Sequence, residues 1–302
     1  MKKIKVLLCA TLMSLIWGSA FPISKLAIDQ VGVWGFRIYS LVISVVFLCF
    51  VFFIIGRYRF NIQCFLKSIP LGFLNVFLVP ILNSLALKHT EAVKASVLVY
   101  TMPVMATLLL GIMNKHIEFR SIIVSLLCIS GIFIFIAPSG ISIGEAIILL
   151  SALMWAIGTI LSEKIVLKIN LTSKVFYQNI VSLIFLVLLM PFLDVDVNIL
   201  SNIHPEFLWT VYIPIIYMGL ANGVIVYILW YYMIGHGGVK LSSYSILISP
   251  IISVMISSYL LDESMTISMI IGMLFILLSM LIIFLEKNKV WYSNNGLHAF
   301  SD

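Results

Sequence analysis

Amide and aromatic side chains lie inside long apolar segments of the sequence, where they are candidates for binding an organic solute. Amides donate and accept hydrogen bonds. Tyr and Trp combine an apolar ring face with a polar group, which suits a wet cavity that holds an organic molecule. For each candidate, hydrogen bonding or packing between neighbouring helices is the alternative interpretation. The candidates are Trp17, Asn75, Asn83, Tyr100, Trp155, Gln178, Asn222, Tyr227, Ser243 and Tyr244.

Charged residues in or beside the same segments form a second group. Lys25, Arg37 and Lys94 would attract an anionic or carboxylate-bearing solute if their side chains converged. Each could instead extend its charged group along its apolar stem to a surface. Glu163 is the candidate for carrying a proton, and the alternative is that it places charge at a segment boundary beside Lys164.

Three prolines inside apolar segments are candidate hinges: Pro22, Pro103 and Pro250. Proline lacks a backbone N–H, so it loosens a helix one turn back, near Val99 for Pro103 and near Ile246 for Pro250. The freed carbonyls would face a cavity or serve as flexing points. A static kink is the alternative.

No pattern in the sequence supports catalysis. There is no Gly-rich phosphate loop, no His-Glu-x-x-His zinc helix and no nucleophile motif placed on a turn. The four cysteines and five histidines share no metal-ligand spacing. We therefore expect no catalytic residue, no metal site and no cofactor.

The composition requires that lipid, not water, surrounds most of the chain. Hydrophobic residues make up 62% of the sequence and charged residues 10%, and the mean hydropathy is +1.18. Soluble domains carry about 25% charged residues. Backbone groups in lipid must be paired within helices or a closed barrel, and the unbroken apolar runs 42–55 and 275–284 lack the alternation of a barrel. The predicted fold class is an all-α membrane protein.

We predict ten transmembrane helices joined by short connections, since a span needs about 20 mainly apolar residues. Residues 1–139 would hold the first five, residues 140–286 the second five, and residues 287–302 a cytoplasmic tail. The predicted spans are 4–27, 33–55, 65–87, 92–113, 121–138, 144–166, 175–192, 207–233, 239–261 and 266–285.

The two groups of five spans are expected to be copies of one unit. Trp17 pairs with Trp155 at an offset of 138 residues, and His89 and Pro103 pair with residues of the same type 147 positions later. Because five is an odd number, the second copy enters the membrane from the opposite side, so the repeats are inverted. Secondary transporters are often built this way, with a substrate site between the halves.

The distribution of charge predicts the orientation. With a cytoplasmic N-terminus, that side carries 14 of the 18 basic residues and the far side 8 of the 12 acidic residues, as expected for cytoplasmic loops. We expect an inner (cytoplasmic) membrane protein, monomeric or homodimeric, with both termini in the cytoplasm. Topology explains the net charge of +6, so a nucleic-acid partner is not expected. Trp230, near a span end, is expected to be an interfacial anchor.

The chain resembles the EamA-type branch of the drug/metabolite transporter superfamily over nearly its whole length. The resemblance rests on the five-plus-five spans, on Phe36-Arg37 early in the second span, and on Leu261-Asp262-Glu263, which is similar to the acidic turn that closes the ninth span of the family. His116, with Glu118 close by, takes the corresponding place in the first half, where the family usually has Glu. The longer matching motifs are WGSAFPISK, AVKASVLVYTMPV and VKLSSYSILISPIISVMISSYLLDES.

The resemblance implies a proton-coupled or facilitative carrier of small molecules. The hypothesis is a secondary transporter that moves small organic metabolites, amino acids or related solutes, by alternating access, in the direction of export. Its partners would be a small-molecule substrate and the lipid bilayer. The alternatives are a non-transporting membrane scaffold or sensor subunit and a membrane-embedded lipid-processing enzyme.

Overall fold

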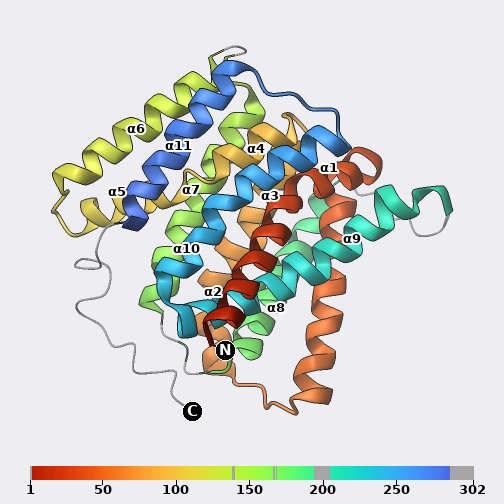
Figure 1. Ribbon diagram of the computed structural model, residues 1–302. Helices are drawn as coiled ribbons and strands as arrows, with labels where there is room; N and C mark the ends of the chain where they lie inside the picture. The colour runs from red at the N-terminus through yellow and green to blue at the C-terminus, as the bar shows by residue number, and fades with distance from the viewer. Residues whose placement is uncertain (1, 138–139, 166, 168, 194–204, 286–302) are drawn as a thin grey trace.

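The computed structural model describes residues 2–137, 140–165, 167, 169–193 and 205–285, and only the backbone of residues 2–7, 205, 231, 233–246 and 284–285. The described elements are all helices, packed into one bundle (Figure 1). The predicted tail, residues 287–302, lies outside the described part.

The first half of the chain forms eight helical elements, of which η1 and η2 are π-helical. They are α1 (Lys2–Cys49), η1 (Phe50–Ile55), α2 (Ile62–Leu71), η2 (Gly72–Leu78), α3 (Val79–Leu87), α4 (Ala92–Val99), α5 (Met102–Met113) and α6 (Phe119–Ile136).

The second half forms nine described elements, of which η6 and η7 are π-helical. They are α7 (Ile143–Lys164), α8 (Leu171–Leu189), η3 (Met190–Phe192), η5 (Pro205–Phe207), η6 (Leu208–Tyr212), α9 (Ile213–Tyr217), η7 (Met218–Ile225), α10 (Val226–Leu260) and α11 (Ile267–Leu285).

Seven described helices are long and apolar enough to cross a membrane, and two shorter apolar helices follow them at Leu247–Leu260 and Ile267–Ile283. Large apolar side chains such as Phe133 and Leu188 are exposed on the outside of the bundle, as lipid contact requires. These features confirm an all-helical, multi-pass membrane protein. Ten crossings and their inverted arrangement stay predictions.

Gly32 divides the longest helix. The span Leu8–Ile55 has 48 residues, and at about 1.5 Å per residue such a helix is far longer than the bilayer core of about 30 Å. Gly32 has a φ of 70° and a ψ of 168°, which is non-helical. A positive φ favours glycine because it has no Cβ. The break falls between the first two predicted spans.

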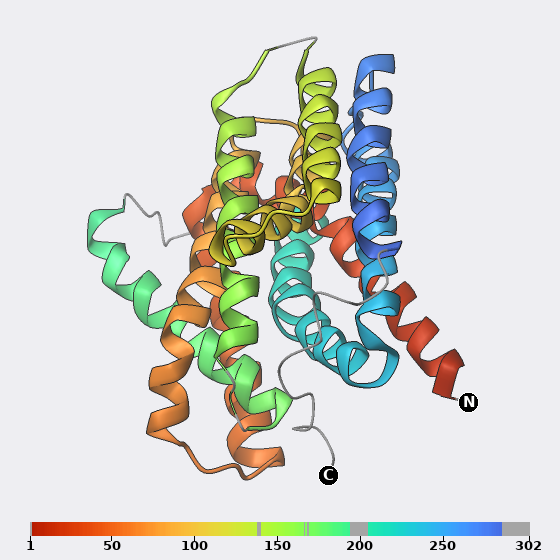
Figure 2. The same cartoon turned by 90° about the vertical axis from the view of Figure 1, so that its left-hand side faces the viewer.

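Glycines allow α6 and α11 to pack closely, and Figure 2 shows the two helices side by side. A Cβ atom at Gly131 would lie 2.9 Å from the carbonyl oxygen of Gly272, and a Cβ at Gly272 would lie 2.6 Å from that of Gly131. Small residues commonly permit such close contacts between membrane helices.

Candidate functional site

A cavity of about 90 Å³ lies between elements of the two halves, and we call it the central cavity. Seven of the ten predicted binding residues line it, together with the predicted cation Arg37. The seven are Trp17, Asn75, Asn83, Tyr100, Trp155, Asn222 and Tyr227. The volume is below the roughly 300 Å³ at which ligand pockets commonly begin, so an organic solute requires the surrounding helices to move apart.

Two amides of the central cavity also connect α3 and η2 to α7. Asn75 Nδ2 donates to Ser162 Oγ at 3.2 Å, and Asn83 Oδ1 accepts from Ser151 Oγ at 2.5 Å. Asn75 Oδ1 is buried without a hydrogen-bond partner among the described residues. These side chains therefore make the inter-helix contacts of the alternative interpretation while they also line the cavity.

Asn75 and Asn222 occupy matching places in the two halves. Asn75 lies in the π-helical η2 and Asn222 in the π-helical η7, 147 residues later. Gly72 and Gly219 have the same separation: a Cβ at Gly72 would lie 2.8 Å from Gln178 O, and a Cβ at Gly219 would lie 2.8 Å from a backbone oxygen of α1. Single π-helical turns occur frequently at functional sites. The recurring sequences GFLN, at 72–75, and GLAN, at 219–222, are the signal in the sequence that predicts this pairing.

Aromatic rings form one wall of the central cavity. The Trp17 and Trp155 rings are edge to face with centroids 6.0 Å apart, and Trp230 lies 5.5 Å from Trp17. The Trp230 ring thus packs against Trp17, and its role as an interfacial anchor stays a prediction. Tyr100 is buried at the C-terminal end of α4, where its hydroxyl interacts with Ser249 of α10.

Gln178 and Glu163 do not line the central cavity. Gln178 is buried in α8, and its Nε2 has no partner within the described part of the chain. Glu163 is exposed in the last turn of α7. Ser243 and Tyr244 lie in α10, where only their backbone is described; the predictions for their side chains fall outside the described structure.

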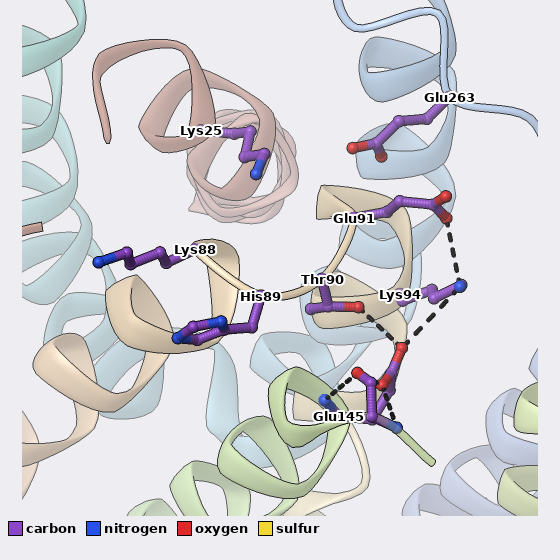
Figure 3. Close-up of a pocket in the computed structure, with 9 residues that line it drawn as sticks. Lys25, Lys88, His89, Thr90, Glu91, Lys94, Glu145 and Glu263 are labelled. Carbon is purple, nitrogen blue, oxygen red and sulfur yellow. Dashed lines mark hydrogen bonds and ion pairs between the residues drawn. The ribbon is translucent and has the colours of Figure 1, made fainter. Parts of the chain in front are cut away.

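Lys25 and Lys94 do not converge with Arg37. Both line a second cavity of about 390 Å³ (Figure 3), which we call the outer cavity because the predicted topology puts it away from the cytoplasm. Lys25 Nζ donates to the carbonyl of Leu87 at 2.6 Å and pairs with Asp29 at 3.2 Å. The case in which all three cations converge on one solute is therefore excluded for Lys25 and Lys94 with Arg37.

Glu145 of α7 lines the outer cavity and contacts the turn between α3 and α4 and the first turn of α4. Lys94 Nζ lies 3.9 Å from Glu145 Oε1 and 3.6 Å from Glu91 Oε2. Thr90 Oγ1 donates to Glu145 Oε1 at 2.8 Å, and Ser142 bonds to the same carboxylate as part of a capping box at the start of α7. The buried charge of Glu145 is therefore compensated by polar groups from two elements.

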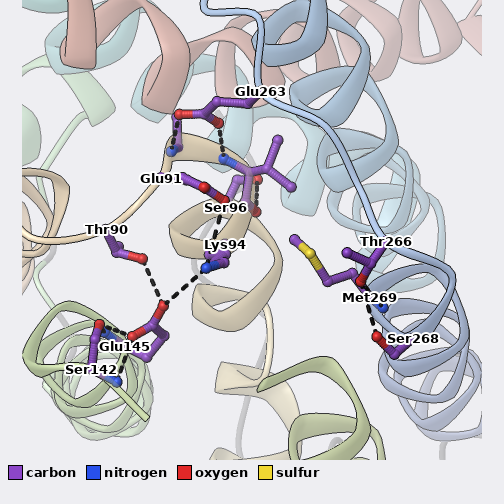
Figure 4. A network of polar contacts seen from close by, with 12 residues as sticks. Thr90, Glu91, Lys94, Ser96, Ser142, Glu145, Glu263, Thr266, Ser268 and Met269 are labelled. Atoms are coloured by element: carbon purple, nitrogen blue, oxygen red, sulfur yellow. Dashed lines mark hydrogen bonds and ion pairs between the residues drawn. The ribbon is translucent and has the colours of Figure 1, made fainter. Parts of the chain in front are cut away.

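Glu263 binds the first turn of α4 from the opposite half of the chain (Figure 4). Its two carboxylate oxygens accept hydrogen bonds from the backbone N–H groups of Ala92 and Val93, both at 2.8 Å. Asp262, which has a φ of 54°, forms the turn that precedes Glu263. A carboxylate at a helix N-terminus satisfies unpaired donors and complements the helix dipole.

Burial raises the pKa of Glu263 above its ordinary value, and the two backbone hydrogen bonds only partly offset this. The nearby Glu91 also raises the pKa, whereas Lys25 lowers it. The outer end of the bundle therefore contains a carboxylate whose protonation depends on whether it is buried against α4.

The helix containing Pro103 is interrupted next to the central cavity. Helix α4 ends at Val99, Tyr100 is its C-terminal cap with φ −77° and ψ 5°, and α5 begins at Met102. Pro103 occupies the first turn of α5, where proline is favoured. Pro22 and Pro250, by contrast, lie inside α1 and α10. No group of three or more described His, Cys, Asp or Glu residues could hold a metal ion.

Comparisons with known proteins agree with a helical carrier. The model of the EamA-like transporter family matches residues 4–137 and again residues 142–285. An uncharacterized transporter from Archaeoglobus fulgidus is 23% identical over 270 residues, which cover 86% of this chain and 90% of that protein. A protein known from a crystal structure has a similar fold, with a TM-score of 0.59 and 14% identity over 92% of this chain and 96% of its own.

Proposed function

Because this chain belongs to the EamA-like transporter family of the drug/metabolite transporter superfamily, we propose that it exports small organic metabolites across the cytoplasmic membrane. The transported solutes are amino acids or related molecules, and they bind in the central cavity. The observation that carries this proposal is the lining of that cavity, to which both halves contribute an amide and a tryptophan: Asn75 and Trp17 from the first, Asn222 and Trp155 from the second.

The proposed mechanism is alternating access by two inverted repeats. In this conformation polar contacts hold the outer ends of the helices together: Glu263 binds α4, and Glu145 binds Thr90 and Lys94. Transport outward requires these contacts to break, so that α4 swings about the interruption at Tyr100. When the two halves exchange conformations, the cavity opens to the other side of the membrane.

A transport assay with a thiol reagent tests the proposal. The protein, with its four native cysteines replaced by Ser, is reconstituted into liposomes and tested for counterflow of a panel of amino acids and organic acids. We expect saturable counterflow that a membrane-impermeant thiol reagent blocks in the Tyr100→Cys variant. Ile141→Cys is the control, because its side chain is exposed in the loop before α7, where the reagent can reach it, and labelling there should leave transport intact. Absence of counterflow for every solute would contradict the proposed function.

The same liposomes distinguish the alternatives. A scaffold or sensor subunit would move no solute, and a lipid-processing enzyme would change the lipid composition of the vesicles, which mass spectrometry detects. The family and the transporter relative point to transport rather than to either alternative.

Proton coupling is assigned to Glu163. This residue follows Ser162, which accepts a hydrogen bond from the cavity residue Asn75. Flux driven by an imposed pH gradient should disappear in Glu163→Gln while counterflow, which needs no gradient, continues. Unchanged gradient-driven flux in that variant would remove Glu163 from the mechanism.

A further inference from the structure

The described lining of the central cavity contains a guanidinium group but no carboxylate. Arg37 lines the cavity, its Nε atom is buried without a hydrogen-bond partner, and no described Asp or Glu lies within ion-pair distance of it. The other titratable side chains of this lining are Tyr100 and Tyr227, and Tyr227 is the one that interacts electrostatically with Arg37.

Arg37 differs in this respect from the two lysines of the outer cavity. Lys25 is paired with Asp29, and Lys94 with Glu91 and Glu145. A guanidinium remains protonated at physiological pH. Charged groups within a membrane protein are normally paired, because an uncompensated charge away from water is unfavourable. The central cavity therefore has a positive charge that the described residues leave uncompensated.

Two other unpartnered polar atoms of the cavity are suited to a donor, not to an anion. The Oδ1 atoms of Asn75 and Asn222 are both buried without a partner in the described residues, and both are hydrogen-bond acceptors. An anionic group would be repelled by these oxygens and attracted by Arg37. Arginine also presents its donors in a planar fork that matches the two oxygens of a carboxylate.

We propose that the transported solute carries a carboxylate that binds to the guanidinium of Arg37 in the central cavity. Arg37 thereby selects anionic or zwitterionic solutes over their neutral or cationic analogues. The apolar part of the solute contacts the aromatic wall formed by Trp17, Tyr100 and Trp155. This assignment rests on the proposed transport function and adds the chemical class of the substrate.

Matched acid and amide pairs test the assignment in the reconstituted protein. The probes are lactate with lactamide, 3-methylbutanoate with 3-methylbutanamide, and leucine with leucinamide, each measured by counterflow and by the shift in melting temperature on binding. We expect the acid of at least one pair to bind and move, and its amide to do so about tenfold more weakly or less. In Arg37→Gln the preference for that acid should be lost, and Arg37→Lys should restore it in part.

Lys67→Gln is the control, because it removes one positive charge from an exposed side chain of α2, outside both cavities. It should leave the ratio of acid to amide unchanged. The melting temperature of Arg37→Gln without solute shows whether the variant is folded. If it is not folded, the ratio of acid to amide is measured in Arg37→Lys instead.

Binding of none of the acids would overturn the assignment, and so would an acid preference that survives in Arg37→Gln. If only amides or amines move, this inference fails while the proposed transport function stands. If no probe of any charge moves, and the wider panel of solutes also shows no counterflow, the proposed function fails with it.

Discussion

Trp17 and Trp155 lie edge to face in the wall of the central cavity, with ring centroids 6.0 Å apart. The two residues are 138 positions apart in the sequence, and each comes from the first predicted span of its half. Edge-to-face contact is a favourable arrangement for aromatic rings. The contact therefore joins the two halves of the chain at the wall of the proposed binding site.

Removal of the Trp155 ring should impair transport more than it impairs folding. In Trp155→Ala we expect counterflow to fall by about tenfold, since an aromatic pair contributes about 0.5–1.5 kcal/mol beyond its buried area and the solute also loses its contact. Trp155→Phe should retain most of the activity. Trp209→Ala is the matched control, because that ring is 73% exposed. Equal losses in the Trp155 and Trp209 variants would contradict a role for the cavity wall.

The outer end should close at low pH through Glu263. Burial raises the pKa of this carboxyl in the closed arrangement, and exposure on opening returns the pKa toward about 4.3. The closed form thus binds the proton more tightly and is most stable below the ordinary pKa. As pH rises through the raised pKa, that stability is lost and opening becomes more frequent.

Labelling of a cavity cysteine measures this opening. A cysteine-free variant carrying Ser24→Cys, a residue of the central cavity, should react faster with an external thiol reagent as the pH rises through this window. Rates are normalised to Ile141→Cys, an exposed position, which corrects for ionisation of the thiol. Glu263→Gln should flatten the normalised profile, and an unchanged profile in that variant would rule out Glu263 as the titrating group.

Pro103→Ala should slow transport without weakening binding. An N–H at position 103 could pair with the carbonyl of Val99, which would join α4 and α5 into one helix and stiffen the interruption at Tyr100. We expect a several-fold lower maximal counterflow rate with an unchanged half-saturation concentration. Pro22→Ala is the comparison, because Pro22 already lies inside a continuous helix. An equal effect of the two substitutions would argue against a hinge at Tyr100.

Gly131→Val should destabilise the contact of α6 with α11. The added side chain would meet the backbone of Gly272, and overpacking of this kind costs about 1–3 kcal/mol. We expect a lower melting temperature in detergent and a lower free energy of unfolding. Phe133→Leu on the exposed face of α6 should leave both values nearly unchanged. Retention of native stability by Gly131→Val would show that the helices can separate freely.

The helical fold and much of the cavity lining can be predicted from two features of the sequence: the length of its apolar segments and the polar residues inside them. Apolar length located the helices, and Gly32 lies between the first two predicted spans. The amides and aromatics of the central cavity were found because polar groups are unusual inside apolar segments. The repeated Asn75 and Asn222 show that internal comparison would have strengthened this prediction further.

What the sequence could not supply is the direction in which each side chain points. Arg37 and Lys25 both fall in the outer halves of their spans, yet they line different cavities, because rotation of a helix about its axis is decided by packing. The contact of Glu263 with Ala92 joins residues 171 positions apart, and no local pattern encodes it.

The carboxylate of Glu263 has no counterpart of its own kind in the other half. The position 147 residues earlier is His116, an exposed residue in the turn before α6. A histidine cannot offer two acceptor oxygens to a helix N-terminus, so His116 could not repeat the contact that Glu263 makes with α4. In the proposed alternating-access mechanism, inverted copies of equal energy would spend equal time facing each way, and this difference between the halves would give the empty carrier a preferred resting side before any solute or gradient acts on it.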